Sequence, residues 1–156
     1  MTITPEFFVL TRAECTEVLA RNQVGRIAFR AGRRVELVPL GYAVRDEWIF
    51  LRSAHGAKIE AFMKDPFVAF EVDEIDGPFD WRSVVVHGTI YLLQMNGGPI
   101  VNRDARPALE ALRAAMPGAF SPDDPVPERQ IIYGLYIQEL DGRMARSGAP
   151  DSPTNV

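Results

Sequence analysis

The segment 53–58, with the sequence Ser-Ala-His-Gly-Ala-Lys, carries residue types that bind a phosphate group. It lies where an alternating, strand-like pattern gives way to a helical one. Free backbone N–H groups and the ammonium of Lys58 therefore point to the same place. Lys58 and Lys64 are the lysines among 17 basic residues, and an ammonium suits phosphate as a compact point charge. The pattern predicts a phosphate site at Lys58, and a solvated surface lysine is the alternative.

The apolar periodicity around this hinge predicts a mainly β protein. Thr11 followed by Glu14 forms a capping box that opens the first helix, and Asp65 before Pro66 ends the second. The predicted helices cover residues 11–22, 58–64 and 107–116, and the predicted strands cover residues 24–29, 35–44, 48–51, 67–73, 81–93 and 131–137. Turns or breaks are expected at 31–33, 45–47, 77–78 and 96–99, with an exposed, proline-containing loop at 121–127. We expect a six-stranded barrel with a few helices.

One domain accounts for the chain. A length of 156 residues suits a single core, and residues 1–146 carry all the predicted elements. The segment 147–156 is rich in Pro, Ser, Gly, Thr and Asn, and we expect it to be a disordered tail.

Pro39 interrupts the predicted strand 35–44, because proline cannot donate to a sheet ladder. The strand is therefore expected at an edge or at a bulge, with backbone groups left open on one side. Such an opening can give hydrogen bonds to a planar ligand. A simple edge strand, blunted against aggregation, is the alternative.

The bulk composition excludes several classes of function. A net charge of −4 with no basic cluster argues against nucleic-acid binding. No apolar run is long enough for a membrane span, and the first residues lack the pattern of a signal peptide, so we expect a cytoplasmic protein. Cys15 is the single cysteine and is expected to be a small buried hydrophobe; with two histidines, no metal site is predicted.

The usual catalytic templates are missing from the sequence. It has no Gly-x-Ser-x-Gly elbow, no phosphate loop of the Gly-x4-Gly-Lys type and no His-Glu-x-x-His. If the protein is an enzyme, a bound cofactor is expected to carry the reaction.

The succession of segments 38–42, 48–51, 53–58, 65–72 and 81–88 resembles a known superfamily. It is the pyridoxamine 5′-phosphate oxidase-like group of FMN-binding split-barrel proteins, and the closest branch is the nitroimidazole-reductase-like, flavin-nucleotide-binding one. The resemblance covers Leu10 to Arg146. It implies a homodimeric six-stranded split barrel that binds two FMN molecules in grooves between the protomers, and a small-molecule substrate.

The resemblance also implies roles for individual residues. Ser53 and Lys58 would hold the FMN phosphate, and backbone groups of Val38, Pro39 and Leu40 would meet the isoalloxazine ring. Four residues would line the same groove or its counterpart across the dimer: Trp81, Arg82, Ser83 and Val84. For Trp81 the alternative is an aromatic of the core or dimer interface, and for Arg82 a surface arginine paired with an acidic neighbour.

Arg52 departs from the branch, which often has a histidine at this position beside the reactive face of the flavin. Arg52 would instead bind an anionic substrate there, and His55 either belongs to the hinge site or faces solvent. The function that the resemblance implies is an FMN-dependent oxidoreductase acting through the flavin N5. Alternatives are a flavin-storage or sensor protein without turnover, a deazaflavin- or haem-binding barrel, and an empty structural homodimer.

Overall fold

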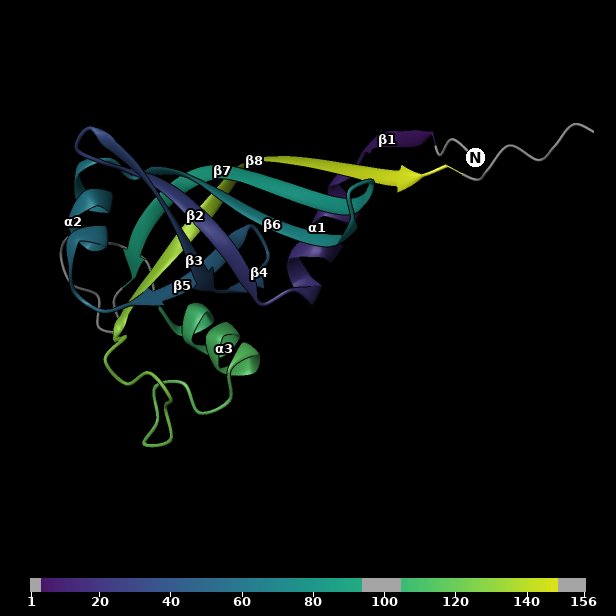
Figure 1. The fold of residues 1–156 in the computed structure, drawn as a ribbon. Helices are drawn as coiled ribbons and strands as arrows, with labels where there is room; N and C mark the ends of the chain where they lie inside the picture. The colour runs from purple at the N-terminus through teal and green to yellow at the C-terminus, as the bar shows by residue number, and fades with distance from the viewer. Residues whose placement is uncertain (1–3, 94–104, 149–156) are drawn as a thin grey trace, which may run out of the picture.

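The alternating apolar pattern folds into one antiparallel sheet that curls on itself (Figure 1). The computed structural model describes residues 4–93 and 105–148. Its elements, in chain order, are β1 (Pro5–Val9), α1 (Arg12–Arg21), β2 (Val24–Ala31), β3 (Arg34–Gly41), β4 (Ala43–Arg45), β5 (Trp48–Ser53), α2 (Ala57–Lys64), β6 (Phe67–Gly77), β7 (Asp80–Leu93), α3 (Arg106–Ala115) and β8 (Ile131–Ser147). The prediction of a mainly β barrel with a few helices is confirmed.

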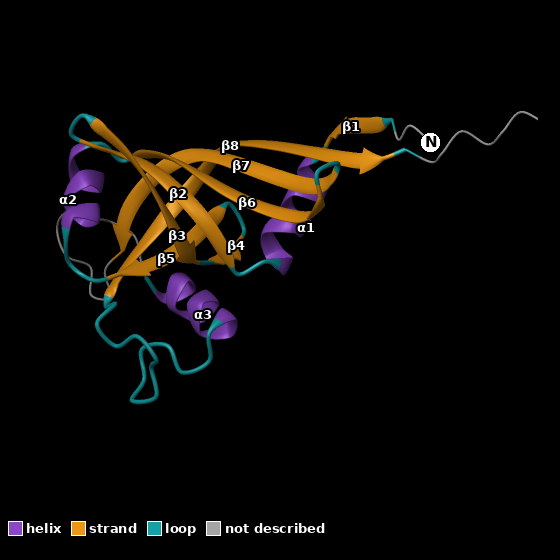
Figure 2. Ribbon diagram, viewed as in Figure 1, coloured by secondary structure: helices purple, strands orange, loops and turns teal. Residues whose placement is uncertain are grey.

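The strand order explains why the barrel is split. Neighbouring strands follow the order β3-β2-β6-β7-β8-β5-β4, and β1 pairs with β8 outside this path. In Figure 2 the strands wrap around a common core while α2, α1 and α3 lie at its periphery. Because β3 and β4 end the order, the sheet stays open between them, and the outer edge of β3 pairs with no strand of the described chain. This places Pro39 on an edge strand, as predicted.

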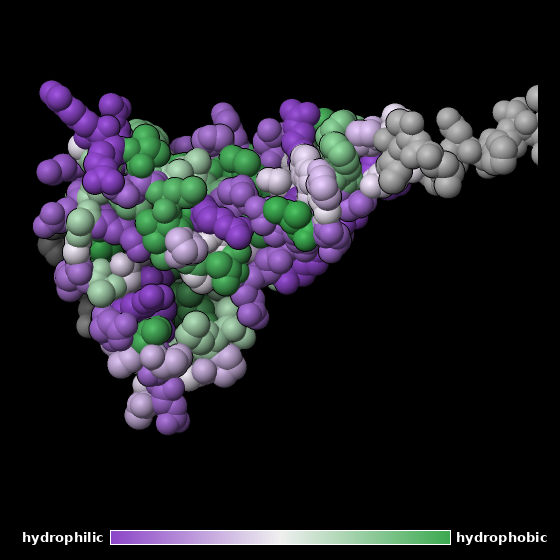
Figure 3. Space-filling model, viewed as in Figure 1, coloured by the Kyte–Doolittle hydropathy of each residue, from purple (hydrophilic) through white to green (hydrophobic). Residues whose placement is uncertain are grey.

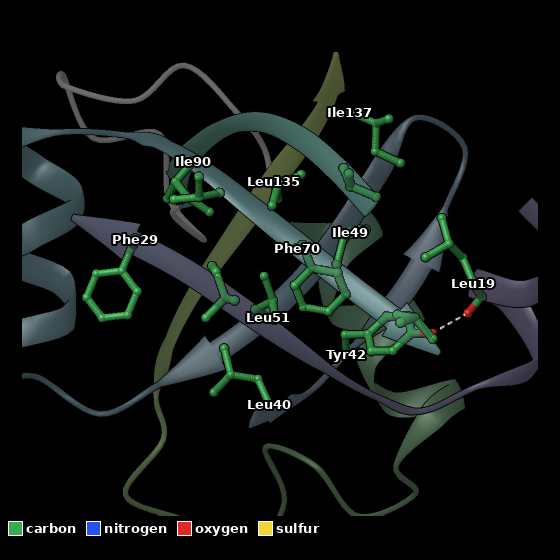
Figure 4. Packing of buried hydrophobic residues seen from close by; sticks show 14 of the residues in the cluster. Leu19, Phe29, Leu40, Tyr42, Ile49, Leu51, Phe70, Ile90, Leu135 and Ile137 are labelled. Atoms are coloured by element: carbon green, nitrogen blue, oxygen red, sulfur yellow. Dashed lines mark hydrogen bonds between the residues drawn. The ribbon is translucent and has the colours of Figure 1, made fainter. Parts of the chain in front are cut away.

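Alternate side chains of the strands fill the barrel. Phe70 and Val72 of β6, with Val84 and Val86 of β7, are fully buried on the inner face. Figure 4 shows this packing, and there the hydroxyl of Tyr42 donates a 2.6 Å hydrogen bond to the carbonyl of Leu19. A buried tyrosine is thereby satisfied and ties the end of β3 to α1.

The helix ends follow from local chemistry. The capping box of α1 is present: Glu14 N–H donates to Thr11 Oγ1 at 3.2 Å, and Thr11 N–H donates to Glu14 Oε1 at 2.9 Å. The α2 helix ends at Lys64, just before Asp65 and Pro66. Cys15 is buried among core residues, so the predicted role as a small hydrophobe is confirmed. No helix of the described chain is long and apolar enough to cross a membrane.

Some strand boundaries differ from the prediction. The predicted strand 35–44 divides at Tyr42, whose side chain turns into the core, to give β3 and β4. The sequence pattern did not reveal β1, because Phe7 and Val9 stay exposed and show no core face. Pairing with β1 extends β8 to Ser147, which the prediction placed in the tail. The predicted break at 96–99 and the tail beyond Gly148 lie outside the described residues.

Gly88 marks a close approach between two strands. The register between β7 and β8 shifts between His87 and Gly88, and a Cβ on Gly88 would collide with the backbone carbonyl of Tyr136. A side chain cannot be accommodated there without moving the strand.

We expect Gly88→Ala to lower the free energy of unfolding by about 1–3 kcal/mol, because the added methyl group forces the strands apart. Urea unfolding followed by circular dichroism measures the change. Gly77→Ala is the matched control, since its nearest atom would be Asp80 Oδ2 at 3.8 Å. Equal stability of the two variants would contradict the close approach.

Candidate functional site

The hinge after β5 presents backbone donors at the start of α2. Gly56 is the N-cap residue of α2, and no side chain caps the helix there. The first N–H groups of the helix are therefore available to a ligand. Ser53 is buried beside them, and its hydroxyl donates to the carbonyl of Ala54 at 3.0 Å. The hydroxyl oxygen keeps lone pairs, and a ligand could compete for its proton.

Lys58 lies in the first turn of α2 and is half-buried. Burial lowers its pKa from the ordinary value, and the nearby charge of Arg129 lowers it further. No described residue accepts a hydrogen bond from Lys58 or forms an ion pair with it. A partly desolvated ammonium without a counter-ion, next to a helix N-terminus, is suited to an anionic ligand.

Arg52 is engaged within the protein. Its guanidinium contacts Asp124 through two hydrogen bonds, of 2.6 and 3.2 Å, and the two side chains are 6% and 1% exposed. Its Nε donates to the carbonyl of Arg129 at 2.9 Å, and its Nη2 also donates to the carbonyl of Val126 at 3.1 Å. The ring of Phe120 lies 4.1 Å from the guanidinium carbon. An added anion would have to displace a buried carboxylate, so these contacts favour a structural role, and ligand contact by Arg52 stays a prediction.

Asp124 organises the segment between α3 and β8. Besides Arg52, its carboxylate accepts hydrogen bonds from the backbone N–H groups of Phe120, at 2.8 Å, and Val126, at 3.0 Å. The hydrogen bonds from Arg52 lower the pKa of Asp124 to about 2. The sequence predicts an exposed loop at 121–127, and the burial of Asp124 corrects that prediction at this residue.

The end of β3 shares a cavity with Arg52. The cavity has a volume of about 160 Å³ and lies between the barrel, α3 and the segment that holds Asp124. Its lining includes Gly41, Tyr42, Arg52, Met116 and Arg129. Val38 is half-buried, Pro39 is opposite Arg26 in the β2 register, and Leu40 is buried. Of the predicted site residues, Arg52 lines this cavity, whereas Val38, Pro39, Leu40, Ser53 and Lys58 are not part of its lining.

The predicted residues of β7 lie elsewhere in a single protomer. Trp81 opens β7 and pairs with Ala145 near the end of β8, whereas the hinge is beside the start of β8. Its indole N–H donates to the carbonyl of Pro78 at 3.2 Å. Val84 is fully buried in the core, Ser83 is half-buried, and Arg82 is exposed opposite Glu74. Any contact of these residues with the same ligand would involve a second protomer.

A further titratable cluster lies on the outer face of the sheet. Arg26 of β2 contacts Asp73 at 3.2 Å and Glu71 at 3.9 Å. Burial, aided by the neighbouring Asp73, raises the pKa of Glu71 to about 7. Glu71 Oε1 has no hydrogen-bond partner in the described structure, and no group of three metal-ligating residues occurs there. The sequence pattern gave no sign of this cluster.

Comparison with known proteins agrees with this architecture. The sequence profile of the pyridoxamine 5′-phosphate oxidase family matches residues 11–144. An uncharacterized protein of Rhizobium meliloti (strain 1021) is 27% identical over 148 residues, which are 90% of this chain and 96% of that protein. The structure of an FAD-binding protein from Mesorhizobium loti superposes with a TM-score of 0.70 and 26% identity, covering 94% of this chain and 100% of the other.

A Bacteroides thetaiotaomicron protein, described as a candidate 5-nitroimidazole antibiotic resistance protein, has a TM-score of 0.69 and 13% identity. The aligned regions cover 92% of this chain and 90% of that one. The open antiparallel barrel with its hinge after β5 defines the class of split-barrel proteins. Within that class, the chain belongs to the pyridoxamine 5′-phosphate oxidase family. The resemblance inferred from the sequence is confirmed.

We expect the stability difference between the wild type and Asp124→Asn to be largest above pH about 4 and to shrink toward pH about 2. The folded-state pKa of Asp124 is lowered from 3.8 to about 2, so the ionised form stabilises the fold above the unfolded pKa. This contribution is lost as the pH falls through the folded pKa. Urea unfolding across this pH range measures the difference. Asp123→Asn, at the exposed neighbouring position, is the control, and a pH-independent difference would contradict the assignment.

Proposed function

We propose that the protein is an FMN-dependent oxidoreductase that acts on a small molecule as a homodimer. The observation that carries the proposal is Lys58: a half-buried cation with no counter-ion among the described residues, beside an uncapped helix N-terminus. The FAD-binding relative from Mesorhizobium loti, with 26% identity, supports a flavin as the ligand. A bound flavin would supply hydride or electron transfer through its N5 atom.

The hinge residues and the edge strand β3 carry the kinds of groups that the phosphate and the ring of FMN require. Its phosphate dianion requires a cation and hydrogen-bond donors, which Lys58, the α2 N-terminus and Ser53 can provide. The isoalloxazine ring requires an apolar wall and a few backbone partners, and the edge strand β3 offers both at Val38, Pro39 and Leu40. These groups would bind and orient the flavin from one protomer.

A second copy of the chain would cover the outer face of β2, β3 and β6. Figure 3 shows hydrophobic surface gathered over these strands. Val35 and Leu37 of β3 and Phe67 of β6 are 77%, 67% and 66% exposed. A groove of about 340 Å³ lies on this face, with Ala28 and Ala69 in its lining. Contiguous exposed apolar surface of this kind marks an interface, and a symmetric partner could bring its Trp81 and Ser83 to the flavin.

We expect Lys58→Ala to weaken FMN binding roughly 10- to 100-fold, because a charge-assisted contact with the phosphate is lost. Riboflavin, which lacks the phosphate, should bind the variant and the wild type equally. Fluorescence titration of the purified protein measures both affinities. Lys64→Ala is the matched control, since it removes the other lysine of the chain from the opposite end of α2.

Unchanged FMN affinity in Lys58→Ala would contradict the phosphate assignment. An absorbance spectrum, taken after adding FMN and removing the excess by gel filtration, tests flavin binding itself. Retained flavin that a reductant bleaches, and that an added acceptor reoxidises with turnover, supports the oxidoreductase. Retained flavin without turnover would support storage or sensing instead.

We expect Leu37→Glu to convert the dimer to monomers, because it would bury an unpaired carboxylate in the interface. The dimer dissociation constant should rise by about tenfold or more, and FMN affinity should fall with it. Analytical ultracentrifugation measures the assembly state. Met63→Glu is the control, because Met63 is 63% exposed but lies on α2. A wild-type monomer, or a dimeric Leu37→Glu, would contradict this interface.

A further inference from the structure

A second cation lies beside the hinge, at the start of β8. Ile131, the first residue of β8, pairs with Ser53, the last residue of β5, and Arg129 lies two residues before Ile131. The backbone of Arg129 is held at both of its polar groups. Its N–H donates to the carbonyl of Val126 at 3.0 Å, and its carbonyl accepts from Arg52 Nε at 2.9 Å. A fixed backbone therefore presents the exposed guanidinium of Arg129 to the site.

Three side chains near the start of β8 and the first turn of α2 carry hydrogen-bond donors for which the described residues supply no acceptor: Lys58, Arg129 and Tyr133. Neither Lys58 nor Arg129 forms an ion pair with any described residue. Tyr133, near the start of β8, is fully buried, and its hydroxyl has no hydrogen-bond partner among the described residues. Its ring packs against Phe62, with the centroids 5.3 Å apart, and Phe62 lies one helical turn after Lys58 on the same face of α2. Lys58 of α2 and Arg129, just before β8, thus carry charges that no described acidic side chain pairs with.

Two cations held close together repel each other. The hydrogen bond from Arg52 Nε to the carbonyl of Arg129 holds Arg129 beside the residue that precedes Ser53, and the charge of Arg129 lowers the pKa of Lys58. A bound dianion would convert this repulsion into attraction to both cations. A guanidinium can make two parallel hydrogen bonds to phosphate oxygens, while an ammonium acts as a point charge. Arg129 and Lys58 could therefore contact one phosphate in different ways, the first through paired hydrogen bonds and the second through its charge.

We propose that Arg129 binds the phosphate of the ligand together with Lys58, and that the Arg52–Asp124 pair positions Arg129 for this contact. The proposal rests on the proposed flavin site and adds a specificity-determining residue to it. Arg52 then contributes to binding through another residue, because it anchors the backbone carbonyl of Arg129 instead of contacting the ligand.

The test compares FMN with riboflavin. Arg129→Ala should weaken FMN binding about tenfold and leave riboflavin binding unchanged, and Arg129→Lys should retain most of the FMN affinity. Arg146→Ala is the control, since it removes an exposed arginine from the far end of β8. Equal effects of Arg129→Ala on both ligands, or no effect on FMN, would overturn the proposal.

A second readout separates this proposal from the flavin assignment. Inorganic pyrophosphate should raise the Tm of the wild type and raise that of Arg129→Ala distinctly less. If neither flavin binds the wild type, the proposed function fails, while a pyrophosphate shift that depends on Arg129 still supports the cation pair. Equal Tm shifts in the wild type and in Arg129→Ala would overturn the proposed role of Arg129.

The positioning role of the ion pair has its own signature. Asp124→Asn should reduce the preference for FMN over riboflavin, because the backbone of Arg129 is then less firmly held. A purely structural role would weaken both ligands by the same factor and leave the preference unchanged. Such a result would remove Asp124 from the proposal.

Discussion

The buried pair of Arg52 and Asp124 fixes how the chain is arranged around its barrel opening. A guanidinium and a carboxylate removed from water remain ionised only when their hydrogen bonds are satisfied. The carboxylate accepts from Arg52 and from two backbone N–H groups, and the guanidinium also donates to two backbone carbonyls. The segment between α3 and β8 therefore has a defined path, and the position of Arg129 follows from it.

The open edge of β3 is the complementary constraint. Closing the barrel would satisfy that edge but would remove the backbone groups that the proposed flavin ring would meet on β3. Pro39 limits the hazard, since it cannot donate to a foreign strand. The exposed Val35 and Leu37 on the same strand gain more from a symmetric partner than from water. One strand would thus serve both the proposed ligand and the proposed assembly.

Local features of the site could be predicted from sequence, whereas long-range contacts could not. The edge position of Pro39 and the hinge before Lys58 follow from residue chemistry within a few positions. The partner of Arg52 lies 72 residues away, in a proline-containing loop with several equally plausible acids and no periodic pattern. β1 escaped prediction for a related reason: its pairing with β8 leaves Phe7 and Val9 exposed, so no core face shows in the sequence.

Lys58 and Arg129 differ from the arginines of the chain that form ion pairs with acidic side chains. The chain has 21 acidic residues against 17 basic ones, so acidic partners are abundant. Arginines elsewhere on the surface use them: Arg45 contacts Glu110 at 2.7 Å, and Arg146 contacts Glu6 at 3.0 Å. At the hinge, by contrast, Lys58 is partly desolvated and has Arg129 as its charged neighbour. A nearby carboxylate would stabilise the empty site but would compete with an anionic ligand. In the proposed site, leaving the cations unneutralised would lower stability slightly and keep their charge available to an anionic ligand.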